Sequence, residues 1–248
     1  MPRSEKSPTR LFVDAPLDAP RLSLGVEQAH YLGRVLRCRE GDEIIVFNGC
    51  GTERSAVIKS LARRQPVIAL GPSVEPLPEP DTPILLLQAM VKSDAMDLIV
   101  QKATELGVDS IFATRTEFGV VRLDVERQRR RLTHWRRIAA SACEQSGRHR
   151  PPSFEIFDSL GDAIGAVPAD CSRMAFDIDA GSTLDGNARP GSGICLAIGP
   201  EGGFSPDELT RLTAQGFALS SLGARILRAE TAAIAACAAV RLLKRDPG

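Results

Sequence analysis

Two glycine-containing loops near the C-terminus carry the residues best suited to chemistry. The first reads Gly-Pro-Glu-Gly-Gly over residues 199–203 and follows an apolar run of strand length, residues 194–198. The second spans residues 221–228 and overlaps the end of a shorter apolar run, residues 217–222. Glycines let another molecule approach the backbone without meeting a Cβ, and open α/β sheets usually bind ligands where strand ends open into such loops. The pattern predicts a ligand site formed by both loops.

The sequence of the loops narrows the type of ligand. It contains neither a GxGxxG dinucleotide fingerprint nor a GxxxxGK[ST] phosphate loop. Leu222, Ile226 and Leu227 would form the walls of an apolar slot, with the glycines as points of close approach. Taken alone, the first loop could equally be a tight turn that binds nothing.

Helices are expected to follow each loop. Ser205, Pro206 and Glu208 have the spacing of an N-cap with a capping box, so a helix should begin at Pro206. Residues 229–243 are rich in alanine and predict a second helix, which can lie very close to a neighbour because it bears few large side chains.

The sheet that positions the loops is predicted by the segments before them. Residues 84–90 form a continuous apolar run, as expected for a strand buried on both faces. A helix over residues 95–106 and a strand over residues 108–114 complete a β–α–β unit, which implies parallel pairing. A long helix is expected over residues 127–146 and a further strand over residues 172–177.

The first 75 residues have a different character. Short strand-like runs are expected at residues 11–13, 43–47, 56–61 and 66–70, with a hairpin signal at Asn48-Gly49 and one helix over residues 26–36. These elements predict a small β-barrel. Five prolines in residues 71–83 indicate a semi-rigid linker, so we expect two domains, residues 1–75 and 76–248.

Composition limits the function classes. The chain of 248 residues has no net charge, no apolar run of membrane-spanning length and no signal peptide. Its six cysteines are scattered without metal-ligand spacing. We therefore expect a cytoplasmic protein with reduced thiols, no metal and no membrane contact.

Positive charge is concentrated in residues 122–150, which contain nine arginines and three acidic residues. Such a run is often only the solvated face of a helix. Arginine in preference to lysine favours phosphate contact, because the planar guanidinium makes two-point bonds to phosphate. The stretch therefore indicates an RNA-contacting surface.

Longer motifs resemble a known family. Gly-Pro-Glu-Gly-Gly-Phe-Ser at residues 199–205 and Ser-Leu-Gly-x-Arg-Ile-Leu-Arg-x-Glu-Thr-Ala at residues 221–232 are similar to the C-terminal signature of RsmE-type enzymes, of the SPOUT class of RNA methyltransferases. Residues 30–37 (His-Tyr-Leu-x-Arg-Val-Leu-Arg) and 101–108 (Gln-Lys-Ala-Thr-Glu-Leu-Gly-Val) match the same family. The resemblance spans about residues 10–243, and it departs at Ala229, where the family commonly has threonine.

The resemblance implies an α/β fold in two parts: a PUA-like β-barrel that grips RNA, and a SPOUT domain with a parallel sheet and a deep trefoil knot. It implies a homodimer that uses S-adenosylmethionine (SAM) to methylate N3 of a uridine in 16S ribosomal RNA, with free RNA or the small subunit as substrate. The residues expected to bind the cofactor are Ile198, Gly199, Gly202, Leu222, Gly223, Ile226, Leu227 and Phe176.

Further residues are expected to act on the RNA. Arg225 and Arg228 are candidates to stabilise the charge that develops on the uridine, although both could instead tether the last helix through salt bridges. The proton acceptor is open between Glu201, Glu230 and Glu105, of which Glu201 is our first choice. The expected RNA contacts are Arg34, Arg37, Lys92, Arg122, Arg136 and Arg148.

Two other functions remain compatible with the sequence. One is a SPOUT enzyme with another RNA acceptor, such as a ribose 2′-hydroxyl or a transfer RNA base. The other is a non-catalytic RNA-binding protein that acts in ribosome assembly, against which the intact glycine loops argue.

Overall fold

The computed structural model of the chain describes residues 8–62, 65–119, 124–181 and 193–244. These residues form two compact units, which are treated separately below. The first comprises Met1–Leu77 and Cys143–Arg150, and the second comprises Pro78–Ala142 and Pro151–Gly248. The break at Leu77 lies close to the expected domain boundary, but nothing in the sequence indicated that Cys143–Arg150 would join the first unit.

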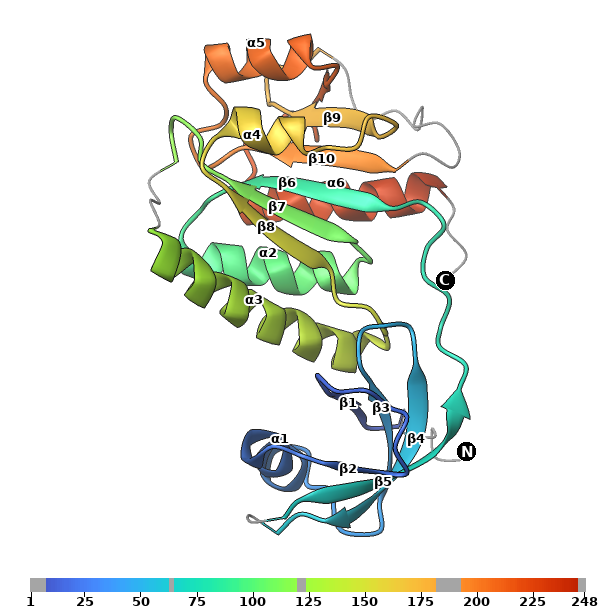
Figure 1. Cartoon of the computed structure of the whole chain (residues 1–248). Helices are drawn as coiled ribbons and strands as arrows, with labels where there is room; N and C mark the ends of the chain where they lie inside the picture. The colour runs from blue at the N-terminus through green and yellow to red at the C-terminus, as the bar shows by residue number, and fades with distance from the viewer. Residues whose placement is uncertain (1–7, 63–64, 120–123, 182–192, 245–248) are drawn as a thin grey trace. The chain divides into compact units, whose positions relative to one another are not determined.

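The first unit is built on a curled, five-stranded sheet (Figure 1). Its strands are β1 (Arg10–Phe12), β2 (Arg21–Ser23), β3 (Glu43–Phe47), β4 (Glu53–Ser60) and β5 (Val67–Val74), in the order β1-β3-β4-β5-β2. β3 and β4 form the expected antiparallel hairpin around Asn48-Gly49. Two register shifts between β4 and β5 bend the sheet. The sheet is a half-barrel with β1 and β2 at its edges, in line with the small β-barrel domain that the sequence predicted.

The helix of the first unit is shorter than predicted. It consists of α1 (Val26–His30) and a π-helical turn, η1 (Tyr31–Val35), in which the Leu36 amide donates to the Tyr31 carbonyl at 3.0 Å. Arg37 does not share a helix face with Arg34, because the helical segment ends at Val35. Arg37 follows the helix end and has a left-handed backbone with φ 60°, and the next amide, that of Cys38, donates to the Leu32 carbonyl at 2.9 Å to close the turn.

The second unit is an α/β domain with a six-stranded sheet. Its strands are β6 (Ile84–Ala89), β7 (Ser110–Thr114), β8 (Ser153–Phe157), β9 (Ser172–Phe176), β10 (Ile194–Ile198) and β11 (Ala218–Ser220), in the order β11-β9-β10-β6-β7-β8. Every pairing is parallel, which confirms the predicted parallel sheet. All residues of β6 and β10 are buried, because helices cover both faces.

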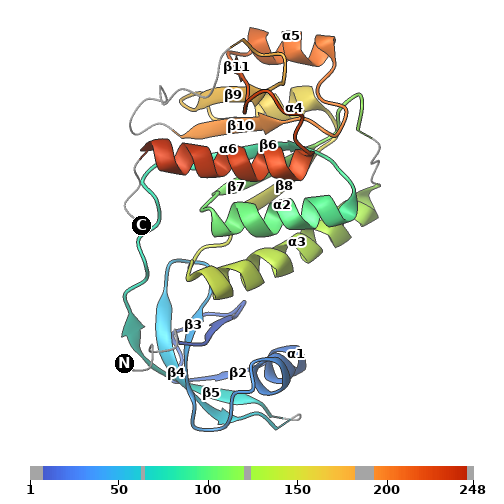
Figure 2. The same ribbon diagram turned by 180° about the vertical axis from the view of Figure 1, so that it is seen from behind.

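Helices cover the two faces of this sheet unequally (Figures 1 and 2). One face carries α2 (Ser93–Glu105), α3 (Val125–Ser146) and α6 (Ala229–Lys244), and the other carries α4 (Leu160–Gly165) and α5 (Pro206–Ala214). Trp135 of α3 is 1% exposed and lies in the core of the first face. α6 buries Ala233, Ala236 and Cys237 and packs against α2 and β10, so its small side chains serve close packing within the chain.

Candidate cofactor and RNA sites

The two glycine loops begin at the same edge of the sheet, on either side of β9. Because all strands of the second unit are parallel, their carboxyl ends lie at one edge of the sheet. At this edge Ile198 of β10 pairs with Phe176 of β9, and Phe176 pairs with Ser220 of β11. The Asp177 amide also donates to the Ser220 carbonyl at 3.0 Å. The loops that follow β10 and β11 therefore lie on either side of the end of β9.

The first loop packs tightly on itself. The Gly203 amide donates to the Pro200 carbonyl at 2.9 Å and closes a turn. A Cβ at Gly199 would lie 3.0 Å from the Gly203 carbonyl carbon and 3.1 Å from the Phe204 nitrogen. A Cβ at Gly202 would lie 3.2 Å from Phe118 Cβ. Glycine at position 199 is thus required by backbone contacts, and Gly203, at φ 72°, is required by conformation.

The second loop is open on one side. Leu222 is half-buried and packs on the core that contains Phe176, Ile198 and Ala229. Gly223 has φ 107°, is exposed, and has no heavy atom within 4 Å of an added Cβ. Ile226 is 86% exposed. The loop therefore offers accessible backbone and uncovered apolar side chains at the edge of the sheet.

A buried carboxylate joins the first loop to a third one, which follows β7. Glu208, 9% exposed, accepts hydrogen bonds from the amides of Ser205 and Glu117, both at 2.9 Å. The Glu208 amide donates to Ser205 Oγ at 3.3 Å, which confirms the predicted capping box. The sequence did not indicate the bond to Glu117, because it spans 91 positions.

Most of the candidate catalytic residues are accessible to solvent. Arg225, Arg228 and Glu201 are exposed. Arg228 Nη1 lies 4.0 Å from Glu230 Oε1 at the start of α6, in line with the alternative that it tethers this helix. Glu105 pairs with Lys102 at 2.8 Å on the surface of α2. Their catalytic roles stay predictions.

The candidate RNA contacts differ in accessibility. Arg34, Arg37, Lys92 and Arg136 are exposed, and Lys92 lies directly before α2. Arg148 is only 9% exposed, so its guanidinium is poorly placed for phosphate. Arg122 lies outside the described residues.

The arginines of α3 project on the side opposite its core residues. Arg129, Arg130 and Arg137 line a shallow pocket of about 390 Å³ together with Thr133, His134 and Glu126. His134 Nε2 lies 2.8 Å from Asp97 Oδ2 and joins α3 to α2. This exposed face presents clustered guanidinium groups that can bind an anion.

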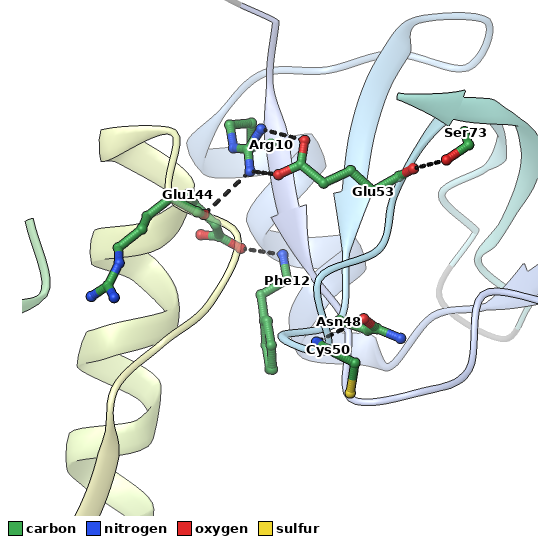
Figure 3. Close-up of polar contacts among 8 residues, drawn as sticks. Arg10, Phe12, Asn48, Cys50, Glu53, Ser73 and Glu144 are labelled. Atoms are coloured by element: carbon green, nitrogen blue, oxygen red, sulfur yellow. Dashed lines mark hydrogen bonds and ion pairs between the residues drawn. The ribbon is translucent and has the colours of Figure 1, made fainter. Parts of the chain in front are cut away.

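A polar network in the first unit was not predicted (Figure 3). Arg10 pairs with Glu53, which is 2% exposed, with Nη1 3.0 Å from Oε2. A second Arg10 nitrogen donates to the Arg148 carbonyl at 3.2 Å, and Glu144 Oε1 accepts from the Phe12 amide at 2.8 Å. Burial raises the pKa of Glu144, against the lowering effects of that bond, a bond from Tyr31 and the charge of Arg10.

Two of the cysteines lie in the apolar cores of the second unit. Cys195 and Cys237 are fully buried, and burial raises the pKa of the Cys237 thiol to about 12. Within the described ranges, no group of three or more His, Cys, Asp or Glu residues is arranged to hold a metal. None of the described helices is long and apolar enough to cross a membrane.

The carboxyl edge of the second sheet fits a ligand that is partly apolar and partly polar. Open space borders the backbone of Gly203 and Gly223, and apolar Leu222 and Ile226 are available for contact. Thr116, in the loop joined to Glu208, has a buried Oγ1 without a hydrogen-bond partner among the described residues. Such an edge can take the ring of a nucleoside and bond its polar groups.

Comparison with known proteins defines the class. Residues 78–241 match the RNA methyltransferase domain family, and residues 24–70 match the RNA methyltransferase PUA domain family. The chain is therefore an RNA methyltransferase by fold and family.

More specifically, the chain belongs to the ribosomal RNA small subunit methyltransferase E family. It is 30% identical to that protein of Bacillus subtilis over 231 residues, covering 90% of each chain, and 33% identical to that of Rickettsia conorii, covering 86% of each. A solved structure of the Neisseria gonorrhoeae enzyme bound to SAM is 31% identical, with a TM-score of 0.87 over 96% of this chain and 98% of that chain.

Proposed function

We propose that the chain transfers a methyl group from SAM to N3 of one uridine in 16S ribosomal RNA. The observation that carries the proposal is that the two glycine loops begin on either side of Phe176, at the carboxyl edge of a parallel sheet. The family membership supports it, since a related protein of this family was crystallised with SAM. The choice of uridine N3 rests on the family resemblance.

Residues of the two loops would hold the cofactor. Ile198 and Phe176 form the floor, while Leu222, Ile226 and Leu227 are apolar walls that would be covered on binding. Gly202 and Gly223 are exposed and keep their backbone accessible, whereas Gly199 is buried and lets the first loop fold tightly on itself. SAM, when bound, supplies a methyl group already activated by a sulfonium.

The protein would contribute to the reaction by aligning the uridine with the methyl donor and by stabilising the charge that develops on the uridine. Holding the uridine in line with the donor can supply much of the rate enhancement. N3 must lose its proton as the methyl arrives, and Arg225 and Arg228 are the cations of the second loop that would stabilise the resulting charge. Glu201, exposed in the turn of the first loop, is the candidate to accept the proton.

The RNA would be held through phosphate contacts outside this edge. Arg34 and Arg37 would contact phosphates from the first unit, and Lys92 and Arg136 would do so from the second. All four side chains are exposed. We leave Arg148 out because it is buried. The target uridine must be unpaired or flipped out of its stack, since N3 lies in the base-pairing edge.

Three further features of the proposal come from the family resemblance: a trefoil knot around the cofactor, a homodimer, and action in the cytoplasm on RNA or the small subunit. Uncovered apolar side chains at Ile226 and at Leu242, 86% and 80% exposed, are compatible with a partner subunit.

Calorimetric titration with SAM and S-adenosylhomocysteine tests the cofactor site. The wild-type protein should bind both. Gly199→Val should abolish binding, because the new side chain meets the backbone of Gly203 and Phe204. Gly165→Ala is the matched control, since a Cβ there meets nothing within 4 Å. Wild-type affinity in Gly199→Val would remove the first loop from the cofactor site.

A further inference from the structure

A pocket lies on the first unit, beside the junction of α1 and the π-helical turn. Its volume is about 690 Å³, within the range of small-molecule sites. Its apolar lining comes from Val26, Ala29 and Leu61, and its polar lining from Glu27, His30 and Arg34. Gly33 lies between these groups and also lines the pocket. The pocket is formed entirely within the first unit.

The helix geometry keeps this pocket open. The π-helical turn shifts the hydrogen bonding from i→i−4 to i→i−5 at Leu36, and such turns occur frequently at functional sites. Gly33 contributes no side chain. A Cβ there would point at Leu61 Cδ1 from 3.5 Å, an ordinary contact, so no steric reason within the fold requires glycine. Its absence of a side chain leaves space for another molecule.

The groups around the pocket match the chemistry of an unpaired RNA base. The His30 ring is exposed and planar, so it can stack on a base, and Arg34 lies four residues further along the helical segment. Val26, 55% exposed, and the other apolar members can contact the base faces. The Glu27 carboxylate can accept a hydrogen bond from an amino or imino group of the base edge.

Positive charge continues directly beyond the pocket. Arg37 and Arg39 follow the helix end and are exposed, and the left-handed backbone of Arg37 is a conformation that non-glycine residues rarely adopt. Strained residues of this kind concentrate at functional sites. A nucleotide seated in the pocket would have arginines close by for its phosphate, so the surface suits RNA better than an uncharged partner.

We propose that this pocket receives one unpaired base of the ribosomal RNA substrate and that Arg34 and Arg37 bind the adjoining phosphates. The base is distinct from the methylated uridine, which must reach the second unit's cofactor edge. The inference rests on the proposed function, and it assigns His30 a role in base stacking.

Binding of unmethylated 16S ribosomal RNA, made by transcription and titrated at several salt concentrations, tests the proposal. Gly33→Leu fills the pocket, and His30→Ala removes a stacking surface. Each should weaken binding about tenfold without changing the salt dependence, because no phosphate contact is lost. Arg34→Ala should reduce the salt slope by about one phosphate contact.

Gly33→Ala is the matched control, because one methyl in ordinary contact with Leu61 should leave binding unchanged. Thermal unfolding establishes whether each variant is folded. If Gly33→Leu does not fold, His30→Ala still tests the pocket, because His30 lies at an exposed position. Wild-type affinity in both Gly33→Leu and His30→Ala would overturn the base pocket. Failure of the wild-type protein to bind either this RNA or the unmethylated small subunit, with SAM binding intact, would instead overturn the proposed function.

Discussion

At the scale of single residues, Glu144 shows how burial and bonding compete. Its carboxylate accepts the Phe12 amide at 2.8 Å and faces the charge of Arg10, which both favour ionisation. Desolvation outweighs them, and its pKa is raised above 4.5. An acid whose pKa is higher in the folded chain than in the unfolded chain binds its proton more tightly when folded. Its contribution to stability is therefore complete below about pH 4.5 and declines as the pH rises through the raised pKa.

Replacement of Glu144 by glutamine should remove this pH dependence while keeping an acceptor for Phe12. We expect the melting temperature of the wild-type protein, relative to Glu144→Gln, to fall as the pH increases from about 4.5 towards neutrality. Glu43→Gln, at an exposed position of the same unit, controls for general loss of a carboxylate. A difference that stays constant or moves in favour of the wild type would contradict the account.

Residues with local roles were predictable, and residues with distant partners were not. The capping box of Ser205 and Glu208 follows from residue types three positions apart. The positive φ of Arg37 and the burial of Arg148 depend on how a helix end closes and how Cys143–Arg150 joins the first unit. No local pattern encodes either feature.

At the scale of elements, Glu208 connects α5 to the loop after β7. Its two carboxylate oxygens accept from Ser205 and Glu117 and so hold the first glycine loop beside Phe118. A rigid first loop needs both bonds. We regard Glu208 as a positioning residue for the cofactor site.

Glu208→Ala should destabilise the protein by about 1–3 kcal/mol, because two amides lose their acceptor, and should weaken SAM binding in calorimetry. Glu208→Gln keeps one acceptor oxygen and should restore part of the affinity. Asp207→Asn, exposed in the same helical turn, serves as control and should behave as wild type. Unchanged SAM affinity in folded Glu208→Ala would show that this bridge does not shape the site.

Long elements were predicted well, and some of the short ones were missed. β6, β10, α2, α3 and α6 were expected within a few residues of their observed bounds, because apolar runs and helical periodicity extend over whole segments. The sequence did not predict β2, β8 and α4. β2 has three residues of which only Leu22 is partly buried, and α4 has six, so neither is long enough to produce a periodic signal.

At the scale of the whole molecule, the sequence motifs identified the family because they cluster where the parallel sheet brings strand ends together. The half-barrel of the first unit and the SPOUT-like second unit divide the proposed work into RNA binding and cofactor binding. The proposed base pocket at Gly33 could not be predicted from the sequence, because it depends on a π-helical turn that residue types alone do not indicate.

The most direct test of the central claim is to locate the methyl group that the enzyme adds. The protein would be incubated with isotopically labelled SAM and unmethylated small ribosomal subunits or 16S ribosomal RNA, and the RNA mapped by mass spectrometry. We predict a single N3-methyluridine, which Gly165→Ala still produces and Gly199→Val does not. Label on a ribose 2′-hydroxyl or another base, or none by a protein that binds both SAM and RNA, would contradict the account.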